Sequence, residues 1–407
     1  MHFTRRSAVL ALGLVCLAPM VLLPDPGSAA PRARRAGAAQ HAAPKPPQGP
    51  PPRAAFTERE QAAAVIPGIP DARFWADSVE EYQRVLGPFN GPWLALSAGG
   101  EDSAFGAGLL TGLSERGRRP DYTVVTGVSS GALLAPFVFL GPSRDADLKR
   151  DFTAISAADV FEDRRTVDGL LDTWPLREFI AKRITPQLLA EIANEHRRGR
   201  RLIIVTTNID AARPIAWNMG AIAAAGGEAA LKLFRDILLA TSAIPGLFPP
   251  VLIDVEANGK RFSEMHLDGG LAATIYIAPD SMLLASSALR FPASQITLIL
   301  NSKLVSEFSV TDRTLVGVLG RALSVGVKRA TRSAAILIAA AARRGGTDFN
   351  VAYVDQTFDE PSRGMFDPDY MKALFEAGRQ QGQSDQPFRH AMPEATPPQA
   401  ATPQHAN

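Results

Sequence analysis

The stretch YTVVTGVSSGALLAPFVFL, residues 122–140, joins a predicted strand to a predicted helix through a serine that lies between two glycines. Its first part is rich in β-branched residues, and its last part is an apolar run of helical length. Between them stands the pattern G-x-S-x-G, with Ser129 at its centre and Gly127 and Gly131 beside it. Glycines are needed there because a β-carbon would clash in a tight strand-to-helix turn. Ser129 is therefore a candidate nucleophile, at a helix N-terminus where partial positive charge stabilises a developing anion.

Apolar segments of strand length alternate with helical patterns on both sides of this turn, which predicts an α/β fold. The predicted strands are Trp93–Leu96, Tyr122–Thr126, Leu202–Thr207, Phe262–Leu267, Ile296–Asn301 and Phe349–Val354. The predicted helices are Phe105–Arg116, Gly131–Leu140 and Asp312–Arg344, the last capped by Thr311 or Asp312 and ended by Gly345 and Gly346. Apolar and polar residues alternate in Phe349–Val354, which favours a place near the sheet edge. The Ala-rich run Ala334–Ala342 is short and indicates a core helix rather than a membrane segment.

The charge of the chain is unevenly distributed. The 407 residues carry a formal net charge of +2, with 43 basic and 41 acidic residues. Residues 1–55 hold seven basic residues and one acidic residue, hence +6, which leaves −4 for residues 56–407. A body of net negative charge argues against nucleic acid as a partner. The hydrophobic fraction of 46% is typical of a folded protein with a buried core.

Residues 1–29 have the layout of a secretory signal peptide, with Arg5 and Arg6 before an apolar run and small residues near Ala29. We expect the protein to be exported, periplasmic or secreted, and the arginine pair loosely resembles a twin-arginine signal. The apolar run is shorter than the ~20 residues of a spanning helix, so an uncleaved signal that anchors the chain is the alternative. Cys16 lies inside this run and is the only cysteine, so the mature protein is expected to use no thiol chemistry.

A serine nucleophile needs a base, and histidines are few in this chain. Four of the six lie in the predicted signal, tether or tail: His2, His41, His390 and His405. His196 stands in the charged segment HRRGRR, which reads as a solvated turn, and His266 lies two residues before Asp268. The chain order Ser, then Asp or Glu, then His of an α/β-hydrolase has no suitable histidine here. Asp268 is the more promising acid, because it follows a predicted strand and the turn residues Gly269 and Gly270 leave its carboxylate at the strand end.

A glycine-containing loop follows the first predicted strand. Residues 97–108 read SAGGEDSAFGAG and open a helix, so that the backbone amides of Ala98, Gly99 and Gly100 could bind an oxyanion. The loop matches neither the dinucleotide-binding nor the phosphate-loop glycine pattern, which argues against a nucleotide site.

Together, in this order, the glycine loop, Ser129 and Asp268 resemble the patatin-like phospholipase family. The resemblance spans about Trp93 to Arg379 and includes four connecting segments, FGAGLL at 105–110, TNIDAARPIAWNMGAIA at 207–223, TSAIPGLFPP at 241–250 and FDPDYMKALF at 366–375. It implies a three-layer α/β/α fold with a mostly parallel central sheet and a Ser–Asp dyad without histidine. Ser129 would be the nucleophile, Asp268 the proton acceptor, and Ala98, Gly99 and Gly100 the oxyanion hole. The sequence departs from the family at Ala98 and Ser103, where glycines are usual, and alanine would strain the loop if its φ were positive.

The resemblance also sets the expected domain organisation. The predicted segments are a signal peptide at 1–29, a disordered Ala/Pro/Arg-rich tether at 30–55, an N-terminal extension at 56–92, a patatin-like catalytic core at 93–281, the C-terminal part of the same α/β domain at 282–380 and a disordered tail at 381–407.

The expected activity is hydrolysis of acyl esters of lipids through an acyl-enzyme, with no metal or cofactor. The expected partners are a lipid or other acyl-ester substrate and, through the basic tether, anionic membrane. Two alternatives stay open. One is a generic α/β-hydrolase-type esterase that uses a histidine, and the other is a catalytically weak lipid-binding protein of the cell envelope.

Overall fold

The computed structural model describes residues 52–87, 89–285, 291–305 and 307–393. The predicted signal peptide and most of the predicted tether lie outside the described residues.

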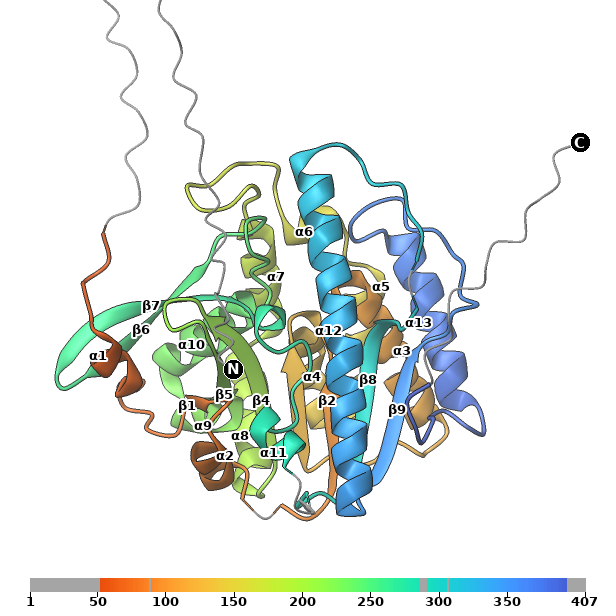
Figure 1. Cartoon of the computed structure of the whole chain (residues 1–407), viewed down its shortest axis with the longest axis horizontal. Coiled ribbons are helices and arrows are strands. Elements are labelled where there is room, and N and C mark those ends of the chain that lie inside the picture. Colours follow the sequence, from red (N-terminus) through yellow and green to blue (C-terminus); the bar gives the residue numbers. More distant parts are fainter. Residues whose placement is uncertain (1–51, 88, 286–290, 306, 394–407) are drawn as a thin grey trace, which may run out of the picture. The chain divides into compact units, whose positions relative to one another are not determined.

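A nine-stranded sheet forms the centre of the domain (Figure 1). Its strands are β1 Arg73–Trp75, β2 Pro92–Leu96, β3 Val124–Val128, β4 Arg201–Asn208, β5 Arg213–Asn218, β6 Val251–Ala257, β7 Lys260–Asp268, β8 Gln295–Lys303 and β9 Asp348–Val354. Their order is β1-β5-β4-β3-β2-β8-β9, and the β6–β7 hairpin pairs with β4 through β7. The five neighbouring strands β4, β3, β2, β8 and β9 are parallel to one another. In contrast, β5 pairs antiparallel with β4 and β1, and β7 pairs antiparallel with β4. The carboxyl ends of the parallel strands therefore meet at one edge, where ligands of such sheets usually bind.

Helices cover both faces of the sheet. They are α1 Glu58–Ala62, α2 Val79–Val85, α3 Ser103–Glu115, α4 Ser130–Leu140, α5 Asp145–Thr153, α6 Ala157–Val160, α7 Trp174–Arg183, α8 Pro186–Arg197, α9 Met219–Ala225, α10 Gly227–Ala240, α11 Asp280–Leu284, α12 Leu315–Gly345 and α13 Pro368–Gln383. Successive strand residues point to opposite faces, so Leu94 and Leu96 join the core under α3, α4 and α13, while Trp93 and Ala95 join the core under α2, α11 and α12. Parallel strands need this double cover because both faces are apolar. The predicted three-layer α/β/α fold is confirmed.

The predicted strands and helices are confirmed, with ends that shift by a few residues. The strand before Ser129 is displaced by two residues, and β9 does lie at the sheet edge. The last long helix begins later than predicted, because its cap is Thr314, whose Oγ1 accepts a hydrogen bond from the amide of Gly317 at 3.0 Å. It ends as expected, with Gly346 in the left-handed region at φ 64°. Among the described helices, none is both long and apolar enough to cross a membrane.

Two glycine pairs hold α3 against α13. A β-carbon at Gly108 would lie 1.9 Å from the carbonyl oxygen of Phe375, and one at Gly378 would lie 2.3 Å from that of Phe105. Gly112 and Gly382, four residues further along each helix, meet the other backbone in the same way. The two helices therefore pack backbone against backbone, which only glycine permits.

This packing corrects the predicted C-terminal boundary. The tail was expected to be disordered from residue 381, yet α13 continues to Gln383 and the backbone of Arg389 pairs with Val351. The Gln-rich composition suggested a tail, whereas the four-residue glycine spacing in both helices was the signal that would have extended the helix.

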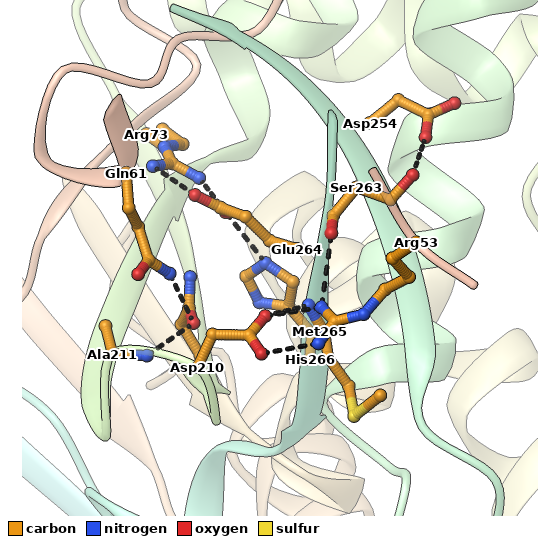
Figure 2. Close-up of polar contacts among 11 residues, drawn as sticks. Arg53, Gln61, Arg73, Asp210, Ala211, Asp254, Ser263, Glu264, Met265 and His266 are labelled. Atoms are coloured by element: carbon orange, nitrogen blue, oxygen red, sulfur yellow. Dashed lines mark hydrogen bonds and ion pairs between the residues drawn. The ribbon is translucent and has the colours of Figure 1, made fainter. Parts of the chain in front are cut away.

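The predicted tether also ends differently. Arg53 lies inside the predicted span 30–55, but its guanidinium contacts both carboxylate oxygens of Asp210, at 2.6 and 2.7 Å (Figure 2). The cation also lies 5.8 Å from the Phe56 ring centroid, and the rings of Phe56 and Phe262 stack at 4.5 Å. Because these contacts attach it to the β6–β7 hairpin, Arg53 belongs to the folded body.

The segment HRRGRR is not a simple solvated turn. His196 lies in the last turn of α8, and Arg201 already belongs to β4. The guanidinium groups of Arg200 and Arg201 lie over the rings of Phe139 and Phe89, with 4.5 and 4.4 Å between charge and ring centroid. These arginines cover apolar surface instead of pointing freely into solvent.

We expect Gly378→Ala to lower the free energy of unfolding by about 2 kcal/mol or more, because its methyl group would collide with the backbone of α3. The matched control is Gly326→Ala on α12, where no atom lies within 4 Å of an added β-carbon. That change should raise stability by roughly 1 kcal/mol through helix propensity. Urea unfolding measures both, and equal effects would contradict the packing argument.

Candidate active site

Ser129 occupies a strained turn between β3 and α4. Its φ of 54° and ψ of −129° are unusual for a residue with a side chain, and they direct the chain sharply from strand to helix. A β-carbon at Gly127 would lie 2.7 Å from the Cα of Ala132, and one at Gly131 would lie 2.5 Å from the carbonyl oxygen of Ser97. Both flanking glycines are therefore required by close packing, as the sequence predicted.

The backbone of this turn is braced by a threonine from another element. The amide of Ser129 donates to Thr241 Oγ1 at 3.0 Å, and that hydroxyl donates to the carbonyl of Val205 at 2.6 Å. Thr241 caps the end of α10 and is fully buried. The strained geometry of Ser129 is thereby fixed to β4. Thr241 lies in the segment 241–250, which was quoted only for its resemblance, so its bracing role was missed.

Asp268 reaches Ser129 because β7 pairs with β4. Asp268 lies opposite Thr206 in that pairing, at the end of β7. Its Oδ2 accepts a hydrogen bond from Ser129 Oγ at 2.6 Å, and its Oδ1 accepts one from the amide of Gly270 at 2.7 Å. A β-carbon on Gly269 would lie 2.2 Å from the carbonyl oxygen of Val205, so only glycine lets the chain turn there. The structure thus brings together two residues that are 139 positions apart in the chain.

Burial raises the pKa of Asp268 to about 6, against the opposing effect of its hydrogen bonds from Ser129 and Gly270. The side chain is almost completely buried. A carboxylate with a pKa near neutrality is a stronger proton acceptor than an exposed aspartate and is still ionised at pH 7. The arrangement can therefore remove the hydroxyl proton of Ser129.

The glycine loop offers fewer amides than predicted. The amide of Ala98 donates to the carbonyl of Thr274 at 2.9 Å, so it is not free to bind an oxyanion and its predicted role is wrong. Alanine at position 98 also does not strain the loop, because Ala98 does not have a positive φ. Gly99 is required by its contact with Asn301, whose carbonyl oxygen would lie 2.2 Å from an added β-carbon, and Gly100 has a φ of 60°. These two glycines remain the candidate donors.

Ser103, the second departure from the family pattern, has a partner. Its hydroxyl lies 2.6 Å from that of Ser130, the residue after the candidate nucleophile, and both side chains are buried. Ser103 begins α3 and Ser130 begins α4. The hydrogen bond therefore joins the N-termini of the two helices that flank the site. The side chain of Ser103 fills the space that a glycine at this position would leave empty.

Two acidic residues of the same loop were not singled out from the sequence. Glu101 accepts hydrogen bonds from Ser362 Oγ at 3.0 Å and from the amides of Phe366 and Asp367, and Asp102 accepts one from the hydroxyl of Tyr370 at 2.6 Å. Burial raises the pKa of both carboxyl groups to about 6. They attach the glycine loop to α13 and the segment before it. Their partners lie more than 250 residues away, so no local pattern marks them.

Neither folded-domain histidine candidate contacts Ser129. His266 lies in a buried network in which Trp217 Nε1 donates to Thr206 Oγ1 at 2.8 Å, and Thr206 Oγ1 lies 3.0 Å from His266 Nδ1. The other ring nitrogen, Nε2, lies 3.2 Å from Glu264, which also receives both guanidinium branches of Arg73 (Figure 2). Burial lowers the pKa of His266, which favours the neutral ring, and the carboxylate of Glu264 beside Nε2 favours the tautomer with its proton on that nitrogen. Both nitrogens are thus occupied by structural partners.

His196 is equally unsuited as a base. Burial, together with the charge of Arg201, lowers its pKa to about 4. Its ring packs against Gly220 of α9, where an added β-carbon would lie 2.5 Å from Nδ1. His390, predicted in the tail, lies near the carbonyl of Phe349 at 3.4 Å.

Two surface cavities lie away from this site. One of about 380 Å³ is lined by α5, α6 and α7, and another of about 410 Å³ lies between α12 and β9. Neither is lined by Ser129 or Asp268. In the part of the chain that the structure describes, no group of three or more His, Cys, Asp and Glu residues could hold a metal ion.

Comparison with known proteins agrees with the sequence resemblance. Residues 94–279 match the family described as patatin-like phospholipase. Among solved structures, the crystal structure of VipD from Legionella pneumophila aligns at 12% identity with a TM-score of 0.36, covering 72% of this chain and 66%, just under two thirds, of VipD. A likeness this weak says nothing about activity. No curated protein matches the chain.

We expect Arg73→Met to lower the free energy of unfolding by roughly 3–5 kcal/mol, because it leaves Glu264 buried without its cation. The control is Arg84→Met, which breaks an exposed pair with Asp71 and should cost less than about 1 kcal/mol. Thermal and urea unfolding measure both. A small effect at Arg73 would show that the network does not stabilise the hairpin.

Proposed function

Residues 94–279 form a patatin-like phospholipase domain, and we propose that this protein is a serine acyl hydrolase that cleaves acyl esters of lipids, as a phospholipase A or lipid esterase. The observation that carries the proposal is the 2.6 Å hydrogen bond from Ser129 Oγ to the buried carboxylate of Asp268. In this reaction Asp268 takes the proton of Ser129 as the serine oxygen attacks the ester carbonyl.

The steps after attack use the same few groups. The amides of Gly99 and Gly100 stabilise the oxyanion, and the N-terminus of α4 adds partial positive charge. Protonated Asp268 gives its proton to the departing alcohol or lysolipid, which leaves an acyl ester on Ser129. Asp268 then takes a proton from water as the water oxygen attacks this ester, and it returns the proton to Ser129 Oγ as the bond to the acyl group breaks and the fatty acid is released. A histidine is unnecessary, because the carboxylate has a raised pKa.

The histidine-dependent alternative has little support, since both ring nitrogens of His266 have structural partners. The other alternative, a lipid-binding protein with little turnover, predicts no covalent reaction at Ser129. A fluorophosphonate probe distinguishes it, because a reactive serine forms a stable adduct that mass spectrometry locates. We also propose that the protein acts outside the cytoplasm. This proposal is based only on the signal-like sequence of residues 1–29.

Ser129→Ala should abolish hydrolysis of p-nitrophenyl acyl esters, and Asp268→Asn should lower kcat by about a thousandfold, because each removes one half of the proton transfer. The matched controls are Ser333→Ala and Asp121→Asn, which change exposed residues of the same types. A phospholipid panel read by mass spectrometry for released fatty acid and lysolipid would define the substrate. Full activity of either site variant, in folded protein, would contradict the proposal.

The pH profile of kcat/KM should have an acid limb near pH 6. Asp268 must be ionised to accept a proton, so activity falls as pH drops below its pKa of about 6 and is level above it. Burial raises the pKa of Glu101 and of Asp102 to about 6 as well, and Glu101→Gln and Asp102→Asn separate these groups from Asp268. The limb should stay in place in both variants, relative to the maximum of each. A limb near pH 4 in the unmodified protein would contradict the assignment to a buried Asp268.

A further inference from the structure

The N-terminal half of α12 exposes apolar residues where a surface helix normally exposes polar ones. Leu315, Val318, Ala322 and Val325 recur at intervals of three and four residues, so they form one stripe on the helix. All four are exposed, and Leu315, Val318 and Val325 keep 64%, 54% and 49% of their surface open to solvent. Helices that pack against a core turn such a stripe inward. Here the stripe points outward.

The segment before α12 extends this apolar surface. Phe308 is 95% exposed and Val310 is 83% exposed. Together with the stripe they form what we call the α12 surface: Phe308, Val310, Leu315, Val318, Ala322 and Val325. Single exposed apolar residues are common on proteins, but a contiguous group marks a site of interaction.

The charge around the α12 surface is positive. Residues 308–330 contain four basic residues and one acidic residue, although residues 56–407 as a whole carry −4. Arg313 and Arg329 are exposed, and neither takes part in an ion pair with any of the described residues. An apolar face bordered by unpaired cations complements a surface of anionic lipid.

The α12 surface lies beside the candidate active site. The N-terminal half of α12 projects beyond the carboxyl ends of the central strands (Figure 1). Leu319, on the inner side of this half, packs on Gly246, since an added β-carbon there would lie 3.1 Å from Leu319 Cδ2. The segment that contains Gly246 also holds Ser129 through Thr241, and Asp268 donates its amide to Ala243 at 2.9 Å.

We propose that the α12 surface docks this protein on an anionic lipid surface, with Phe308, Val310 and the helix stripe inserted among the acyl chains and Arg313 and Arg329 at the headgroups. This rests on the proposed lipid hydrolase function and deepens it, because it places the substrate layer next to Ser129. Leu271, directly after Gly270, is 50% exposed and adds an exposed apolar side chain next to Asp268.

A second copy of the chain is the competing occupant, because the stripe has the spacing of a coiled-coil seam. The stripe spans fewer than the three to four heptads that a coiled coil needs. Arg329 takes the next position along it and would be buried in such a seam. A lipid surface requires neither length nor register, and it also accounts for Phe308 and Val310 outside the helix.

Co-sedimentation with vesicles tests the proposal. The full chain with Ser129→Ala is used, so that binding is read without hydrolysis and stands or falls separately from the proposed activity. On phosphatidylcholine–phosphatidylglycerol vesicles, Leu315→Ser, Val318→Ser and Val325→Ser together should weaken partitioning by roughly tenfold or more. The matched control is Ile336→Ser, which changes a 45% exposed residue further along α12, outside the α12 surface. It should bind as the parent does.

The charged residues give a second measurement. Arg313→Gln with Arg329→Gln should lower binding to these vesicles by about fivefold per charge and leave binding to pure phosphatidylcholine unchanged. All replaced residues are exposed, so thermal midpoints near the parent value show that the fold is kept. Undiminished binding of the triple variant would assign membrane contact to basic residues 30–55 and overturn the proposal. A dimer in light scattering that the triple variant dissociates would overturn it in favour of a second copy.

Discussion

The hydrogen bond between Ser129 and Asp268 requires that the ends of two strands be placed accurately. A donor–acceptor distance of 2.6 Å forms only if β3 and β7, which do not pair with each other in the sheet, end close together. Strand β4 fixes both, because it pairs parallel with β3 through residues 201–205 and antiparallel with β7 through residues 206–208. The glycines at 127, 131 and 269 let three backbones approach closely enough for this contact. A β-carbon at any of them would separate the two side chains.

The buried polar groups near the site fall into two kinds, a candidate proton acceptor and a structural hydrogen-bond network. Asp268 is buried, and burial raises its pKa to about 6, so its carboxylate is suited to accept a proton from Ser129. The chain from Trp217 through Thr206 and His266 to Glu264 and Arg73 is also buried, but each member already has a partner. Figure 2 shows its part from His266 to Arg73. Buried polar groups that are fully paired stabilise a fold and are poor catalysts, because moving a proton would break the network. The same strand thus supplies a structural histidine and, two residues later, the candidate base.

The remaining polar contacts join distant parts of the chain to the glycine loop. Glu101 and Asp102 bind the segment before α13 and the tyrosine of α13, while Ser103 binds Ser130 of α4. The backbone contact of α13 with α3, through Gly108 and Gly378, also fixes the helix that follows this loop. An oxyanion site needs donors that do not move when charge develops. These contacts restrain the loop that carries Gly99 and Gly100.

The sequence alone determined the α/β alternation and the strand-to-helix turn at Ser129, and it singled out Asp268 as the candidate acid in a chain with few histidines. Those features are local: periodicity, glycine spacing and residue type are visible within a few positions. It misjudged Ala98 as an oxyanion donor, began the tail at residue 381 inside α13 and left Arg53 in the tether, because each depends on a partner far along the chain. Only the tertiary structure decided that the Ala98 amide is taken by Thr274 and that Arg73 is held by Glu264. Hydrogen bonds and close packing are decided by which backbones meet in space, and spacing along the chain does not record that meeting.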